Sequence, residues 1–199
     1  MKKLLLSLVL VIAFISSSNA VTYNSDPKIF IEELVQDAIK ILSDKDSNQE
    51  KKYEAIEKIA LQNVDIKGLG MYTLGDIRKT LHKEELTKYH KAFQEYFLKS
   101  LTSRLTDYSK NKFEVLEADK KNSNTTIVKS KIAETVNQPE IKIDWRIYTK
   151  DPLKPLIRDL IVEGLSLART QKEEFSSILS SNNNDINILI SKLMEFVNN

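Results

Sequence analysis

The chain of 199 residues has no cysteine, four glycines, four prolines and two histidines. The absence of cysteine excludes disulfides, thiolate metal ligands and a cysteine nucleophile. Because His82 and His90 are the only imidazoles, little remains for metal binding or general-base chemistry. A hydrophobic fraction of 41% is enough for a packed core, which excludes a disordered chain. The length favours one domain.

Residues 1–20 have the three parts of a secretory signal peptide. Two lysines precede an apolar run over residues 4–15, and Ser18 and Ala20 stand at the −3 and −1 positions of a cleavage site. This run is shorter than the ~20 apolar residues of a membrane-spanning helix, although an N-terminal anchor is the alternative. We expect cleavage after Ala20, a single mature domain over residues 21–199, and export to the bacterial periplasm.

The mature chain also lacks an excess of charge. Removing residues 1–20 takes away two of the 30 basic residues and none of the 28 acidic ones, which leaves a net charge of zero. Nucleic acids and anionic membrane surfaces favour a basic partner. We therefore expect neither of them to be the main partner.

Helical periodicity marks both ends of the mature chain. Asp26 and Pro27 are a typical helix start, and Lys67 to Gly75, with three of the four glycines, predicts a bend. The longest apolar and aromatic stripe extends from Leu86 to Tyr108. The expected helices cover residues 27–43, 53–64, 76–82, 84–108, 165–179 and 186–197.

Between these helices the hydrophobic period changes to two, which is typical of strands. Four strands are expected. The first begins at Phe113, and the other three cover residues 127–134, 141–148 and 156–163. The turns between them are short, so the strands should form an antiparallel meander. We expect an α+β fold with an antiparallel four-stranded curved sheet packed with helices. Periodicity alone leaves open whether the apolar faces close on each other or enclose a cavity.

Catalytic and metal-binding patterns are weak. The spacing of Gly68, Gly70 and Gly75 fits no nucleotide-binding loop, and Ser166 lacks the second glycine of a nucleophile elbow. An N-cap is the ordinary role for this serine. The two histidines lack a third ligand at a standard metal spacing. No catalytic residue and no metal site are therefore expected.

Asp159 and Glu163 lie on one face of the last expected strand, about 13 Å apart. That separation exceeds the roughly 5–9.5 Å between paired glycosidase carboxylates. We expect each carboxylate to hold neighbouring backbone through N–H groups.

Three sequence blocks have a distinctive pattern. The most specific is D-x-x-x-E-G-x-S-L at residues 159–167, followed by Thr170 and Phe175. The others are I-D-W-R at residues 143–146 and a block over residues 74–116 that contains F-Q-E-Y-F-L. In their order and spacing these blocks resemble the MlaC family of periplasmic phospholipid-binding proteins, also called toluene-tolerance proteins. The chain departs from the family where Pro155 replaces a tryptophan and where Gln171 and Lys172 replace a Tyr-Arg pair.

The resemblance implies a soluble phospholipid carrier of the bacterial envelope. Such proteins move lipid between an outer-membrane lipoprotein–porin complex and an inner-membrane ABC transporter with an MCE-domain protein, and they are associated with outer-membrane lipid asymmetry. The family implies no enzyme activity and no cofactor beyond the phospholipid cargo. We expect a monomer.

A soluble lipid carrier needs a dry apolar cavity, because each buried methylene contributes about 0.8 kcal/mol. The head group would stay in water at the mouth, so chain volume should govern selectivity. The expected lipid-binding walls come from the long helix and the sheet: Leu86, Phe93, Phe97, Leu101, Leu105, Ile127, Ile143, Trp145, Ile147 and Ile161.

Two other functions compete with the carrier. One is a periplasmic interaction or adaptor domain that has a filled core and carries no lipid. The other is an envelope hydrolase or acyltransferase in which Ser166 and one of the two histidines form a triad. We rank the carrier above both, because the family blocks match while no catalytic constellation does.

Overall fold

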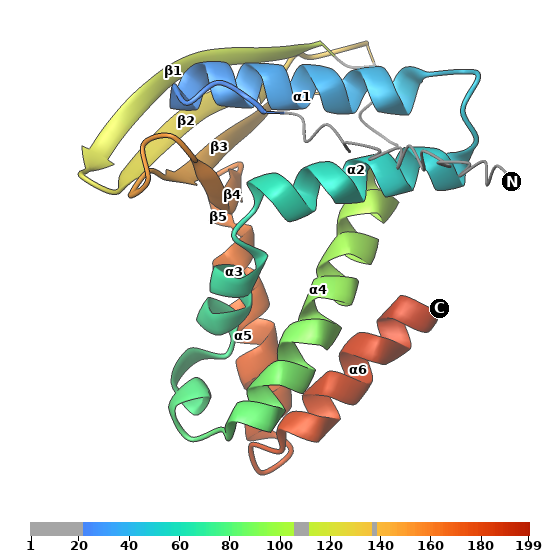
Figure 1. Ribbon diagram of the computed structural model, residues 1–199, viewed down its shortest axis with the longest axis vertical. Helices are drawn as coiled ribbons and strands as arrows, with labels where there is room; N and C mark the ends of the chain where they lie inside the picture. Colours follow the sequence, from blue (N-terminus) through green and yellow to red (C-terminus); the bar gives the residue numbers. More distant parts are fainter. Residues whose placement is uncertain (1–21, 106–111, 137–138) are drawn as a thin grey trace, which may run out of the picture.

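The computed structural model describes residues 22–105, 112–136 and 139–199. The expected signal peptide at residues 1–20 lies outside these residues. The described chain has a sheet with two helices beside it at one end and four further helices at the other (Figure 1). Within the described ranges, no helix has the length and apolar character needed to cross a membrane.

The sheet is an antiparallel meander, as the alternating pattern predicts. Its strands follow the chain order, and each pairs with the next. A short final strand adds a fifth to the four expected. The strands are β1 (Phe113–Asn122), β2 (Thr125–Ile132), β3 (Ile141–Tyr148), β4 (Leu156–Val162) and β5 (Leu165–Ser166).

Five of the six α-helices of the described chain match the expected ones in place. The first begins as predicted: Pro27 follows Asp26, whose carboxylate accepts hydrogen bonds from Lys28 N and Ile29 N. The part of the expected long helix beyond residue 105 lies outside the described residues. The helices are α1 (Pro27–Ser43), α2 (Gln49–Asn63), α3 (Ile66–Thr73), the 3-10 helix η1 (Gly75–Lys79), α4 (Lys83–Leu105), α5 (Leu167–Ser180) and α6 (Ile186–Asn198).

The bend predicted at residues 67–75 is wrong, because most of this segment is helix α3. Asp65 caps the helix by accepting a hydrogen bond from Gly68 N at 2.9 Å. Gly70 permits close packing, since a Cβ there would lie 3.0 Å from Cδ1 of Phe93. The turn itself falls at Gly75, whose φ of +59° favours glycine.

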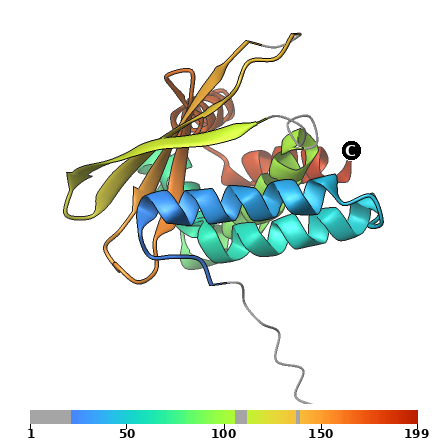
Figure 2. The same cartoon turned by 90° about the horizontal axis from the view of Figure 1, so that it is seen from above.

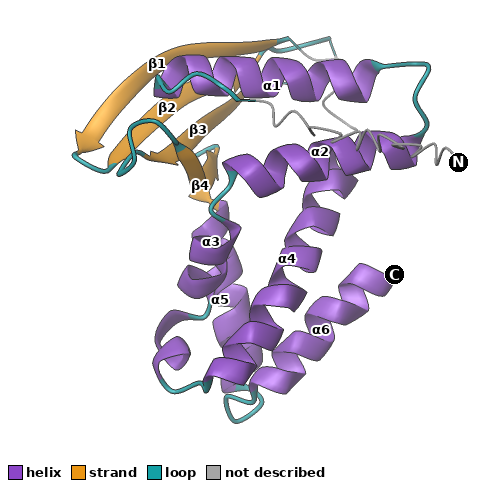
Figure 3. Ribbon diagram, in the orientation of Figure 1, coloured by secondary structure: helices purple, strands orange, loops and turns teal. Residues whose placement is uncertain are grey.

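The buried residues form two separate cores. One lies among the helices and includes Tyr89 and Phe93 of α4, Phe175 of α5 and Leu189 of α6. The other lies between α1 and the sheet (Figure 3). Its buried members are Phe30, Ile31, Leu34, Val128, Ile147 and Ile157. Val64, at the end of α2, packs against both cores.

Candidate functional site

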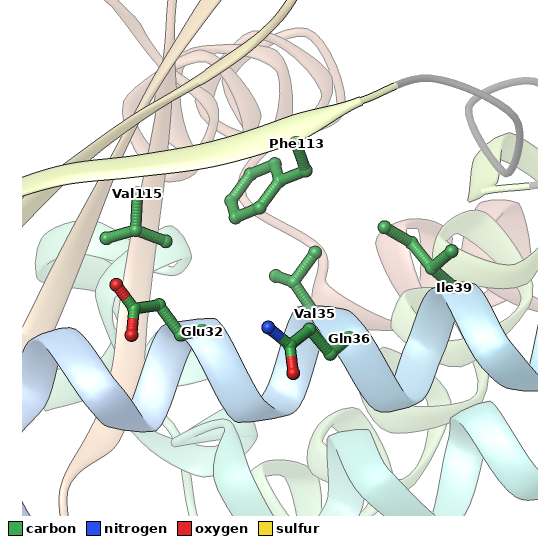
Figure 4. A pocket seen from close by; sticks show the side chains of 6 residues that line it. All are labelled: Glu32, Val35, Gln36, Ile39, Phe113 and Val115. Atoms are coloured by element: carbon green, nitrogen blue, oxygen red, sulfur yellow. The ribbon is translucent and has the colours of Figure 1, made fainter.

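A pocket of about 210 Å³ lies between α1 and β1 (Figure 4). Its apolar lining consists of half-buried side chains from the two elements, and two polar residues of α1 complete the wall. The lining residues are Glu32, Val35, Gln36, Ile39, Phe113 and Val115.

Local sequence explains why these side chains meet. Val35 and Ile39 are four residues apart, so they lie on one face of α1. Phe113 and Val115 are two residues apart, so they share one face of β1. The figure shows the two pairs facing each other across the pocket. The helix therefore presents aliphatic groups to the apolar face of the edge strand.

Trp145 extends this apolar surface along the sheet. Its ring meets the Phe113 ring edge to face, with 6.2 Å between the ring centroids. Its indole N–H donates to Ser130 Oγ at 2.8 Å, and that hydroxyl donates to the Ile143 carbonyl at 2.8 Å. Both polar groups are paired, so they add no unpaired donor to the apolar surface.

The expected wall residues of the sheet divide between its two faces. Ile143, Trp145 and Ile147 alternate with polar residues and lie on the face that α1 covers. Val128 and Leu160 belong to the core that α1 covers. Ile127 and Ile161 are their immediate neighbours along β2 and β4, so their side chains lie on the opposite face of the sheet. These five residues therefore do not surround one space.

The expected wall residues of α4 lie in the helical core. Phe93 is buried there, and Leu86, Phe97 and Leu101 pack against the cluster. The main packing partners of α4 are α6, α3 and α2. The structure does not bring these residues together with those of the sheet. Leu105 is the last residue of α4, but its side chain lies outside the described ones.

Sequence reasoning assigned none of the six pocket-lining residues to the site. A signal was present in α1, where Val35 and Ile39 widen the apolar stripe beyond the fully buried Ile31 and Leu34. A helix whose apolar residues cover more than one face has a second surface to bury. Phe113 and Val115 alternate with polar residues, as expected of a strand with one apolar face, but Phe113 was not assigned to the site.

The D-x-x-x-E-G-x-S-L block forms a structural junction. Asp159 is 4% exposed and accepts hydrogen bonds from Ser166 Oγ at 2.6 Å and Ala168 N at 3.0 Å. Ser166 Oγ in turn accepts from Arg169 N at 3.1 Å and caps α5. The expected N-cap is confirmed, and so is the expected bonding of the Asp159 carboxylate to backbone.

Glu163 also bonds to backbone, since its carboxylate accepts from Lys142 N on β3. Its φ of +49°, followed by +81° at Gly164, forms the tight turn between β4 and β5. Both carboxylates of the block thus fix the end of the sheet.

Neither histidine bonds to Ser166 in the described part of the chain. His90 Nδ1 is buried and has no hydrogen-bond partner among the described residues. Burial, and then the nearby charge of Lys67, lowers the pKa of His90 below its ordinary value. Among the residues described, no group of three or more His, Asp or Glu side chains is placed to hold a metal.

The segment before α1 contains Tyr23, which packs against the sheet core and has a shifted pKa. The Tyr23 hydroxyl donates to Asp37 Oδ2 at 3.1 Å, and its ring meets Phe30 edge to face. Burial, followed by the negative charge of Asp37, raises the pKa of Tyr23 above its usual range. Tyr23 therefore stays a neutral donor that ties the segment before α1 to the helix.

The chain is thus a mixed helix and antiparallel-sheet protein with a pocket between α1 and the sheet that has both apolar and polar lining residues. A family model described as MlaC protein matches residues 32–195. The chain therefore belongs to the MlaC family. No curated protein matches it.

The fold also resembles a solved structure, that of the phospholipid-binding protein from Ralstonia solanacearum in complex with a phospholipid. The TM-score is 0.70 at 18% sequence identity, over 84% of this chain and 94% of that one. At this identity the likeness shows the fold alone.

Proposed function

We propose that this protein is a periplasmic phospholipid carrier. In this proposal it moves lipid between an outer-membrane lipoprotein–porin complex and an inner-membrane ABC transporter with an MCE-domain protein, and so maintains outer-membrane lipid asymmetry. Membership of the MlaC family supports the class of function, and a neighbour of the same fold binds a phospholipid. The observation that carries the proposal is the apolar pocket between α1 and β1.

The pocket has the chemistry that an acyl chain requires. Val35, Ile39, Phe113 and Val115 offer aliphatic and aromatic surface. Each methylene moved from water into such a surface contributes about 0.8 kcal/mol. Two acyl chains of about 15 carbons therefore provide roughly 20 kcal/mol of driving force for enclosure. Binding needs no reacting group, so we propose no enzyme activity and no cofactor.

The volume of the pocket requires a structural change on binding. Pockets for drug-sized ligands occupy about 300–1,000 Å³, and a phospholipid with two acyl chains is larger than such ligands. A pocket of about 210 Å³ holds only part of one chain. We infer that α1 and β1 separate at the Val35 and Phe113 end, while the fully buried Phe30 and Ile31 keep the other end in place.

Widening there would expose further apolar surface of the same sheet face. Of the ten residues expected to line the cavity, we propose Ile143, Trp145 and Ile147 as acyl-chain contacts, because they share this face with Phe113 and Val115. The head group would stay at the mouth, and selectivity would follow chain volume.

We further propose that residues 1–20 are a cleaved signal peptide and that residues 21–199 form the carrier domain, a monomer. Native mass spectrometry of protein purified from periplasmic extract tests this assignment. The expected mass is that of the chain after Ala20 with one phospholipid bound.

Lipid uptake from liposomes tests the pocket directly. In Val35→Trp a large side chain fills the space between α1 and β1, so we expect uptake to fall by at least about tenfold, which corresponds to roughly 1.4 kcal/mol. Leu61→Trp is the matched control, because Leu61 is 49% exposed on α2. Circular dichroism establishes that both variants fold.

Equal uptake by the two tryptophan variants would place the lipid elsewhere. A lipid-free mass, together with no uptake by the unaltered protein, would favour the adaptor domain with a filled core. Uptake of phospholipids that share acyl chains but differ in head group should be similar. A strict dependence on head group would contradict selectivity by chain volume.

A further inference from the structure

A second hollow lies between α3 and α5. It has a volume of about 510 Å³ and is lined by Tyr72 of α3 and by Arg169, Lys172, Glu173 and Ser176 of α5. We call it the α3–α5 groove. In Figure 1 it belongs to the lower, helical end of the molecule, whereas α1 and β1 lie at the top. A partner in this groove would leave the α1–β1 pocket uncovered.

Two basic side chains line the groove, and one of them, Lys172, interacts electrostatically with Asp76, which lies outside the lining. Neither Arg169 nor Lys172 lies within ion-pair distance of a carboxylate in the described ranges. The Lys172 ammonium instead lies 5.3 Å from the centre of the Tyr72 ring. Glu173 is the one acidic residue of the lining. The five lining residues together therefore have one net positive charge, which favours an anionic group beside Arg169 and Lys172.

Apolar surface accompanies this charge. Tyr72, the aromatic residue of the lining, is 44% exposed. Exposed tyrosine and arginine beside apolar side chains are typical of protein interfaces. A concave groove with a single net positive charge gives a lipid surface little to bind, because membrane attachment relies on clusters of basic residues.

We propose that the α3–α5 groove is a docking site for a protein partner that presents an acidic segment with an apolar side chain. A carboxylate of the segment pairs with Arg169 and Lys172, and the apolar side chain packs on Tyr72. The proposal goes beyond lipid binding, because none of these residues lines the α1–β1 pocket.

Photo-crosslinking in cells tests the proposal. A benzoylphenylalanine at Ser176 of the full chain should crosslink to an envelope protein, and mass spectrometry should find Asp or Glu in the attached peptide. The same probe at Lys58, exposed on α2, is the position control. It should not give this adduct.

Charge variants then test the sign of the interaction. Arg169→Glu and Lys172→Glu should each lower the yield of the adduct by at least about fivefold, and Arg169→Gln should lower it less. Glu173→Gln should raise the yield, since it removes the one acidic residue of the lining. Lys88→Glu, on the exposed side of α4, is the matched control and should leave it unchanged.

Several results would overturn the proposal. One group concerns the adduct: no protein adduct, an adduct of lipid alone, or an adduct of a second copy of the chain. The others are an attached peptide without acidic residues and a crosslinking yield that does not change with the charge at Arg169 and Lys172. Lipid uptake by the same variants separates the two proposals. We expect lipid uptake by these variants to be unchanged. A loss of crosslinking without a loss of lipid uptake would then be a defect in docking and not in lipid binding.

Discussion

The most informative stability experiment concerns Asp159, the first residue of the D-x-x-x-E-G-x-S-L block. Its carboxylate is 4% exposed and accepts two short hydrogen bonds, from Ser166 Oγ at 2.6 Å and from Ala168 N at 3.0 Å. A hydrogen bond to a charged group contributes about 1.5–3 kcal/mol. Asp159→Ala removes both and leaves the partly buried Ala168 N–H without its acceptor, so we expect a loss of about 3–4 kcal/mol of unfolding free energy.

A double-mutant cycle isolates the serine contact. Ser166→Ala removes the α5 cap and one donor to Asp159, and it should cost about 1–2 kcal/mol. Because the two side chains bond directly, the double variant should lose less than the sum of the single variants, by about 1 kcal/mol. Urea unfolding followed by circular dichroism measures all four proteins, and the slope with urea should stay constant.

Asp144 provides the control. It lies on the same face of the sheet as Asp159 and accepts no hydrogen bond among the described residues, so Asp144→Ala should change stability by less than about 0.5 kcal/mol. The reasoning is refuted if Asp159→Ala costs no more than Asp144→Ala, or if the effects of Asp159 and Ser166 simply add. Either result would mean that the family block does not join the sheet to α5.

Two further predictions concern other contacts. Burial and the charge of Lys67 lower the pKa of His90. The stability that neutral His90 contributes is therefore present above its unfolded-state pKa and is lost as the pH falls through its folded-state pKa. His90→Gln should remove this dependence, so that the free energy of unfolding changes less with pH below about pH 6.5. Urea melts from pH 8 to pH 5 would show this, and parallel curves for the two proteins would contradict it. Arg158→Ala should cost about 1–2 kcal/mol, because Arg158 Nε donates to Asp65 Oδ2 at 2.6 Å and its guanidinium lies 3.3 Å from the centre of the Tyr148 ring. A thermal melt measures this loss. The melting temperature of Arg158→Lys should lie between those of the unaltered protein and Arg158→Ala.

Local pattern predicted most of the fold because apolar residues recur at helical or strand spacing along most of its elements. The strand over residues 141–148 was predicted with its exact bounds, since Ile143, Trp145 and Ile147 alternate with polar residues. The α1 start was predicted from Asp26 and Pro27. The failure at residues 67–75 has a different cause. Glycine was taken as a helix breaker, whereas Gly70 serves the close approach of Phe93.

The site was harder to predict because it depends on which helix covers the sheet. The stripe of α4 was long enough to suggest a cavity wall, but α5 and α6 bury it, as Phe175 and Leu189 show. Sequence periodicity gives the face of an element and not its partner. For the same reason Ile127 and Ile161 were assigned to one wall with Trp145, although the register places them on the other face.

The division into two cores supports our proposal that the protein opens at the α1–β1 pocket. In the helical core, Tyr89 and Leu189 are fully buried, and exposing a large apolar side chain costs about 1.5–3 kcal/mol. At the α1–β1 pocket, Val35 and Phe113 are only half-buried, so separating them exposes less new apolar surface. An acyl chain entering there replaces the lost contacts with its own. Under this proposal, lipid uptake at the α1–β1 pocket would oppose less of the folding free energy than opening of the helical core would.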